Sequence, residues 1–195
     1  MRVLVACEYS GRVREAFRLL GHDAWSCDLL PSEDNSKFHL RWDVLAVLEN
    51  NWDMMIAHPP CTHLAVSGAW QFKDKQQEQQ EALEFVRLLM NAPINRICIE
   101  NPISIISTAI RKPDQIIQPW MFGHDASKST CLWLKNLPPL VPTHYIEPRV
   151  VNGKQRWGNQ TDSGQNRLSP SPDRWKERSR TYQGIANAMA NQWNF

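Results

Sequence analysis

The sequence predicts an α/β fold in which helices cover both faces of a mainly parallel sheet. Apolar runs alternate with amphipathic stretches along the 195 residues. The apolar runs lack a polar alternation, as expected for strands that are buried on both faces. Unusual residues follow several of these runs, and such sheets bind ligands beyond the carboxyl ends of their strands. A composition of 42% hydrophobic and 22% charged residues is typical of a globular protein and excludes a disordered, collagen-like or coiled-coil chain.

The elements can be justified in order along the chain. Residues 2–7 form a short apolar run, the first strand, and the amphipathic helix that follows is stopped by Gly21. The clearest helix spans residues 74–91, which are rich in Gln and Glu, and Pro93 ends it. The remaining expectations are strands at 24–30, 53–57, 96–99 and 129–135, a short helix at 43–50 and a terminal helix at 182–193.

The chain divides into a core over residues 1–137, an irregular basic segment over 138–180 and a closing helix within 181–195. Residues 141–180 hold eight Lys or Arg and four Asp or Glu, a net charge of +4, so the rest of the +2 chain is −2. Such a basic segment on a near-neutral body suggests a polyanionic partner. A solvated loop explains the same charge equally well.

Membrane and redox features point to a cytoplasmic protein. No apolar run approaches the roughly 20 residues that span a bilayer, and the N-terminus has the character of a strand and lacks the features of a signal peptide. The five cysteines include no Cys-x-x-Cys pair, so disulfides are not expected. Four cysteines lie in apolar stretches as small buried side chains, whereas Cys61 follows two prolines.

A first candidate ligand site is the turn Glu8-Tyr9-Ser10-Gly11 after the first strand. A small turn lets backbone amides and a helix N-terminus approach a polar ligand. Asp28 ends the next strand about twenty residues on and fits a carboxylate that holds ribose hydroxyls. An ordinary strand-to-helix turn and a helix-capping Asp are the alternatives.

A second candidate site is the segment from His58 to His63, in which two prolines leave Cys61 on a rigid loop. A thiolate there is a potential nucleophile if an imidazole, a helix N-terminus or a cation lowers its pKa. His58, Cys61 and His63 are also zinc-ligand types, but no obvious fourth ligand follows, so we expect no metal. A purely structural loop is a further alternative.

The third candidate is Glu100-Asn101-Pro102 after an apolar strand. A carboxylate that emerges from such a strand tends to have a raised pKa and can act as an acid or hydrogen-bond donor. Asn101 precedes a proline and must be extended, which fixes the direction of Glu100. A salt-bridged Glu at the edge of the core is the ordinary alternative.

Together these motifs resemble those of the DNA cytosine-5 methyltransferases. Pro60-Cys61 and Glu100-Asn101 match, in order, the family's Pro-Cys loop and Glu-Asn dipeptide, and VLVACEYSG resembles its S-adenosylmethionine turn. Nearly the whole chain is similar to short phage and prophage proteins of this kind, through HPPCTHLA, ENP, KPDQIIQPWMFG and the closing RTYQGIANAMANQW. The resemblance implies a Rossmann-like class I S-adenosylmethionine-dependent fold with no large target-recognition domain.

The resemblance also implies a role for individual residues. It assigns catalysis to Cys61 and Glu100. It assigns cofactor binding to Glu8, Tyr9, Ser10, Gly11, Asp28, Asp43 and Pro59. Binding of the cytosine and DNA is assigned to Pro60, Asn101 and Arg180, and Lys128 and Thr130 are our candidates for base contact where the family has an arginine-rich strand. Target recognition is left to the basic segment, a second copy or a partner subunit. The sequence departs from the family in its single turn glycine and in Ser127-Lys128-Ser129-Thr130, where an arginine-rich strand is usual.

The implied reaction starts with addition of the Cys61 thiolate to C6 of cytosine, which makes C5 nucleophilic. Glu100 stabilises the ring at N3, C5 takes the methyl group, and a base removes the C5 proton. One alternative is a folate-dependent enzyme of thymidylate synthase type, which also has a Pro-Pro-Cys loop. A second is a DNA-binding or regulatory protein without catalysis. A modified donor or an already modified cytosine would keep the mechanism.

Overall fold

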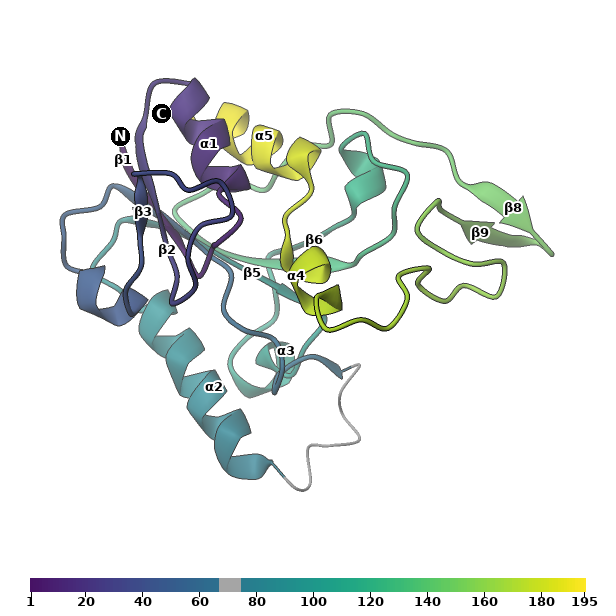
Figure 1. Ribbon diagram of the computed structural model, residues 1–195, viewed down its shortest axis with the longest axis horizontal. Coiled ribbons are helices and arrows are strands. Elements are labelled where there is room, and N and C mark those ends of the chain that lie inside the picture. The colour runs from purple at the N-terminus through teal and green to yellow at the C-terminus, as the bar shows by residue number, and fades with distance from the viewer. Residues whose placement is uncertain (67–74) are drawn as a thin grey trace.

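The computed structural model describes residues 1–66 and 75–195, and its centre is a seven-stranded sheet of order β3-β2-β1-β4-β5-β7-β6 (Figure 1). The first five strands in that order are parallel, and β7 runs antiparallel to both of its neighbours. This arrangement confirms the predicted fold class. The strands are β1 (Arg2–Ala6), β2 (Asp23–Cys27), β3 (His39–Leu40), β4 (Met54–Ala57), β5 (Arg96–Pro102), β6 (Gln115–Ile117) and β7 (Thr130–Lys135).

Helices cover both faces of the sheet, and the two-residue period of the strands sorts the core accordingly. Val3 and Val5 of β1 pack with α1 (Arg12–Leu19) and α5 (Gln183–Gln192), which lie side by side in Figure 1. Leu4 points to the opposite face. That face is covered by α2 (Gln76–Met90), the 3₁₀ turn η1 (Val44–Val47) and the short α3 (Ile106–Ala109).

Several boundaries differ from the sequence prediction. Strand β2 ends at Cys27, three residues early, because Asp28 accepts a hydrogen bond from the Leu30 amide and turns the chain. Strand β5 continues to Pro102, so Glu100 and Asn101 lie within it. Strands β3 and β6 and helix α3 were not predicted, since two to four residues carry too little periodicity.

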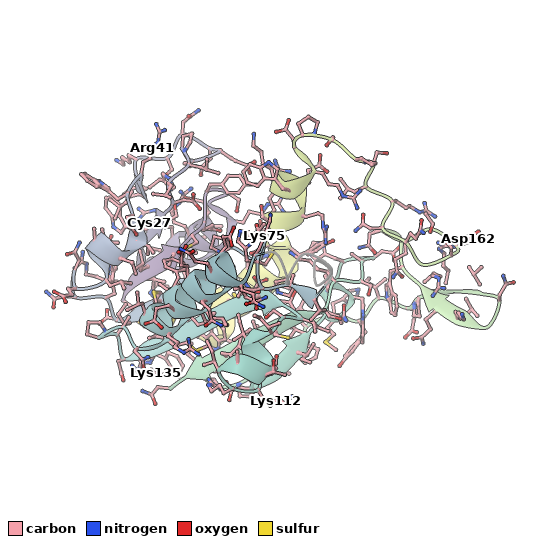
Figure 2. All side chains as sticks on the ribbon, turned by 90° about the horizontal axis from the view of Figure 1, so that it is seen from below. Cys27, Arg41, Lys75, Lys112, Lys135 and Asp162 are labelled. Atoms are coloured by element: carbon pink, nitrogen blue, oxygen red, sulfur yellow. The ribbon has the colours of Figure 1, made fainter. Side chains whose placement is uncertain are left out.

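The segment 138–180 contains a hairpin and a helix. Strands β8 (Arg149–Val151) and β9 (Lys154–Arg156) form an arm that extends away from the sheet. Figure 2 shows Asp162 on this arm, far from Cys27 at the end of β2. Trp157 after the hairpin stacks on Trp120 with ring centroids 5.6 Å apart and planes at 16°, so an aromatic pair joins the arm to the body. Helix α4 (Arg174–Ser179) follows it.

All five cysteines are free thiols. Within residues 1–66 and 75–195, no helix has both the length and the apolar character that crossing a bilayer requires.

Candidate functional site

The register of the parallel strands aligns the residues that follow their carboxyl ends. Ala6 of β1 pairs with Cys27 of β2 and with Ala57 of β4, and Ala57 pairs with Ile99 of β5. The next residues therefore form one row across the sheet: Cys7, Asp28 and His58 follow the ends of their strands, and Glu100 lies beside them within β5. The topology brings the predicted ribose carboxylate and the predicted catalytic carboxylate to the same edge.

The alternation of side chains along a strand determines which face of the sheet carries His58 and Glu100. Side chains two residues apart point to the same face. His58 and Glu100 follow Ile56 and Cys98 by two residues, and these two pack in the core beneath α1 and α5. The pair of His58 and Glu100 therefore lies on the α1 face, next to the turn that joins β1 to α1.

Glu8 is buried in that turn and binds the amino end of α1. Its Oε1 accepts the Val13 amide at 2.7 Å and its Oε2 the Arg14 amide at 3.2 Å. Ser10 donates to the same carboxylate at 3.4 Å. Burial raises the pKa of Glu8, against the opposing charge of His58. These two helix amides, expected to face a ligand, are thus engaged by the chain's own carboxylate.

Tyr9 is buried beneath α4. Its hydroxyl donates to the Lys176 carbonyl at 2.7 Å and lies 3.0 Å from Ser179 Oγ, and its ring meets Trp175 at 5.9 Å between centroids. Gly11, at the end of the turn, has φ +73°. In this structure Tyr9 therefore joins the first turn to the basic segment.

Asp28 and Asp43 gather at the end of β1. Burial first, and then the charges of both carboxylates, raise the pKa of the Cys7 thiol, which places the three groups in one neighbourhood. Asp28 accepts the Leu30 amide at 2.9 Å, and Asp43 accepts the Leu45 amide at 3.0 Å as the cap of η1. Burial raises the pKa of Asp28. The two predicted cofactor acids thus occupy one corner of the sheet edge.

The Pro-Pro-Cys loop is fixed to β5. The Asn101 side chain donates to the Pro59 carbonyl at 2.8 Å, and both residues are buried. The Cys61 carbonyl accepts the Ala65 amide at 2.9 Å, which closes a turn after the prolines. Pro60 is exposed and Cys61 is partly exposed. Asn101 therefore positions the loop that carries the candidate nucleophile.

The environment of Cys61 has opposing effects on its thiol. Burial raises the pKa of Cys61, the cations Lys128 and Arg178 lower it, and the Glu100 carboxylate raises it. The net shift is upward. Two cations lie near the sulfur, as the nucleophile hypothesis required, but burial outweighs them and keeps the resting side chain a neutral thiol.

His58 and Glu100 form a buried ion pair. Nδ1 of His58 lies 3.3 Å from Oε2 of Glu100, and the two side chains are 10% and 12% exposed. Burial opposes both charges, but the mutual hydrogen bond and attraction prevail: the pKa of His58 is raised and that of Glu100 is lowered. Glu100 is therefore a carboxylate beside a specific partner, His58. A raised pKa of Glu100 was predicted from the sequence, whereas the structure lowers it.

Of the remaining predicted substrate residues, Lys128 acts on this pair. Lys128 donates from Nζ to the Arg178 carbonyl at 2.8 Å and acts electrostatically on both Glu100 and Cys61. Thr130 is buried in β7 and donates to the Lys128 carbonyl at 3.2 Å. Arg180 lies farther out and binds the Glu33 carboxylate with its closest contact at 2.6 Å.

Sequence reasoning missed two residues of this site. His58 was expected only as a metal ligand or as an imidazole acting on Cys61, although its place after β4, opposite Glu100, follows from the strand register. Arg178 could not have been found, because no local pattern indicates that α4 folds back to Cys61. Within the described ranges, no group of three or more His, Cys, Asp or Glu side chains is arranged to hold a metal ion.

Comparison with known proteins identifies the fold. No protein-family model matches the sequence, and no curated protein matches it. The structure is similar to that of the Entamoeba histolytica methyltransferase EhMeth, at 16% identity and a TM-score of 0.55, over 75% of this chain and 58% of that one. The fold is a methyltransferase fold.

A second similar structure is a DNA modification methyltransferase, described as putative, that is encoded within an Escherichia coli prophage. It has 13% identity and a TM-score of 0.49, and the match covers 75% of this chain and 52% of the other. The present chain thus matches little more than half the length of either methyltransferase.

Proposed function

We propose that this protein transfers a methyl group from S-adenosylmethionine to C5 of cytosine in DNA. One observation carries the proposal: on a methyltransferase fold, Cys61 lies on a rigid loop within electrostatic reach of Glu100, at the edge of the sheet where the β1 turn also lies. A nucleophile and a carboxylate beside a cofactor corner are the groups that attack on a pyrimidine ring requires.

The cofactor corner suits S-adenosylmethionine by charge. Glu8, Asp28 and Asp43 supply three carboxylates around the end of β1. The cofactor has a positively charged sulfonium and an ammonium group, both of which carboxylates stabilise, and a ribose diol that a carboxylate can accept from. When bound, it would supply a methyl group on an activated sulfur.

Cys61 would act as the nucleophile. Its thiol gives up a proton to solvent as a pyrimidine enters, and the cations Lys128 and Arg178 favour the resulting thiolate. The sulfur adds to C6 and C5 becomes nucleophilic, while Glu100 holds the ring at N3. After C5 has gained the methyl group, a water molecule acting as the base takes the C5 proton. The C6–S bond then breaks, the Cys61 thiolate leaves and the aromatic ring is restored. In duplex DNA the base would first leave the stack, at a cost of a few kcal/mol.

DNA is the proposed acceptor because cations act on the candidate nucleophile. Lys128 and Arg178 act electrostatically on Cys61, and the basic segment 141–180 carries a net charge of +4. We assign target recognition to the arm, which extends away from the sheet, together with a second copy or a partner subunit.

The decisive experiment is nucleoside mass spectrometry on DNA incubated with the protein and S-adenosylmethionine. We expect 5-methylcytosine with the wild type and none with Cys61→Ala. Cys131→Ala is the matched control, since it removes a buried thiol from β7 and leaves the loop intact. Equal methylation by Cys61→Ala would refute the nucleophile. No modified base from the folded wild type would favour a binding protein without catalysis.

A second experiment isolates the covalent step. An oligonucleotide that carries 5-fluorocytosine should trap the protein, because fluorine cannot leave C5 as a proton does and the bond to Cys61 persists. We expect a DNA-linked band on denaturing gels that depends on S-adenosylmethionine and is missing in Cys61→Ala. Dependence of the adduct on a folate would support the thymidylate synthase alternative.

A further inference from the structure

His58 is a buried group whose chemistry the proposed mechanism does not use. It is the first residue after β4, with its amide bound to the Ala6 carbonyl at 2.9 Å, and so it is held directly opposite Glu100 on β5. Its Nδ1 faces Oε2 of Glu100 at 3.3 Å. The strand register therefore enforces this contact without help from a flexible loop.

The other nitrogen of His58 has no partner among the described residues. Nε2 is buried and makes no hydrogen bond to any described residue. Buried polar atoms are nearly always satisfied, and an exception calls for an explanation such as a catalytic role or a bound group.

The charged groups around His58 come from every neighbouring strand end. Glu100 approaches from β5, Glu8 from the β1 turn and Asp28 from β2, and all three favour the imidazolium. Lys128, before β7, disfavours it. Burial disfavours the imidazolium, but the hydrogen bond and charge of Glu100 and the charge of Glu8 outweigh it and raise the pKa of His58, next to the carboxylate that faces the substrate.

We propose that His58 is the positioning residue that supplies Glu100 with the proton it delivers to N3 of the pyrimidine. This inference rests on the proposed methyl transfer to cytosine. It adds a buried proton source to that reaction, so that Glu100 can act as an acid although it rests as a carboxylate.

The proton is conserved over the cycle. As Cys61 adds to C6 and negative charge develops on the ring, the Nδ1–H bond of His58 breaks and Oε2 of Glu100 takes the proton. The new O–H bond then breaks as N3 gains the proton. His58 is left neutral with a proton on Nε2, and Glu100 is again a carboxylate. When the ring regains aromaticity and Cys61 leaves, N3 returns the proton along the same path.

The test compares the pH dependence of single-turnover methylation in the wild type and in His58→Gln. Gln keeps an N–H donor for Glu100 and cannot hold the proton. Deprotonation of Cys61 affects both proteins alike, so the advantage of the wild type over His58→Gln should be present below the raised pKa of His58 and fall as the pH rises through it. We expect His58→Gln to lose about 100-fold at neutral pH and to recover toward acid pH, where Glu100 is protonated directly. His144→Gln, an exposed histidine, is the control.

A second measurement does not depend on activity. NMR titration of the imidazole should give a pKa for His58 above that of a free histidine, and Glu100→Gln should lower it. Active His58→Gln with a wild-type pH profile would overturn the inference and leave the proposed function standing, as would an ordinary pKa of His58 in an active protein. A wild type that transfers no methyl group would refute the proposed function, and the inference would fail with it.

Discussion

Glycine is required at position 11 both by its backbone conformation and by the side chain that packs against it. Its φ of +73° is rare for residues with a side chain. The space that a Cβ would take is already filled by the guanidinium of Arg14. Arg14 is fully buried and donates to Ser26 Oγ at 2.8 Å and to the Asp34 carboxylate. Gly11 therefore allows a buried arginine to tie α1 to β2 and to the loop beyond it.

Replacing Gly11 by Ala should destabilise the protein by more than the backbone strain alone. Gly21 provides the matched control, because its φ is +82° and its Cβ would meet nothing within 4 Å. We expect Gly21→Ala to cost about 1 kcal/mol, the strain of the left-handed conformation. Gly11→Ala should cost roughly 2–4 kcal/mol, since Arg14 must also move. Urea unfolding measures both, and equal losses would contradict the role of Arg14.

At the scale of elements, α4 owes its position to contacts made far away in the sequence. A six-residue helix is too short to be stable alone. Tyr9 binds its backbone from below, Arg180 pairs with Glu33 beside it, and Arg12 donates to the Thr181 carbonyl at 3.1 Å. These contacts hold α4 over the first turn and bring Arg178 to Cys61.

Removing the Tyr9 hydroxyl should release α4. In Tyr9→Phe the buried bond to the Lys176 carbonyl is lost, at a cost of about 1 kcal/mol. Trypsin should then cut within α4 several-fold faster than in the wild type, because cleavage of a briefly opened segment follows its local stability. Tyr145→Phe, at an exposed tyrosine, is the control. Unchanged cleavage would show that the other contacts are sufficient.

At the scale of the whole molecule, most of the basic segment already has internal partners. Arginines of the basic segment bind groups within that segment. Arg149 pairs with Asp162 at 2.5 Å, and Arg156 and Arg167 donate hydrogen bonds to nearby backbone carbonyls. Lys154, at the hairpin tip, has no hydrogen bond or ion pair to any residue the structure describes. Fewer cations of the basic segment are available to bind phosphate than its net charge suggests.

DNA binding should reflect this distribution of charge. We expect affinity to fall steeply as salt rises, because each neutralised phosphate releases counterions. Lys154→Ala should reduce the slope of log K against log salt by about one. Lys112→Ala, which removes an exposed lysine outside the basic segment, should leave the slope unchanged. A salt-independent affinity would exclude the arm as a DNA-binding surface.

The sequence predicted the sheet and the edge that carries the site because both depend on local patterns. Buried strands are apolar, and the residues after them meet wherever strands run parallel, so Asp28 and Glu100 could be placed together. What the patterns could not predict is the partner of each group. Glu8 bonds to the start of α1, Tyr9 binds α4, and the charge of Glu100 depends on His58. Such pairings arise from three-dimensional packing, which sequence spacing does not encode.

The packing of α1 against α5 has a consequence for how the protein folds. These helices lie more than 160 residues apart in the sequence, yet Val13 and Phe17 share one hydrophobic core with Ile185 and Met189. Closing so long a loop costs conformational entropy before any contact repays it. Topologies dominated by such distant contacts fold slowly, in milliseconds to seconds or longer. We therefore expect the α1 face to form late, after the hydrophobic surface beneath α2 has collapsed from contacts closer in the chain.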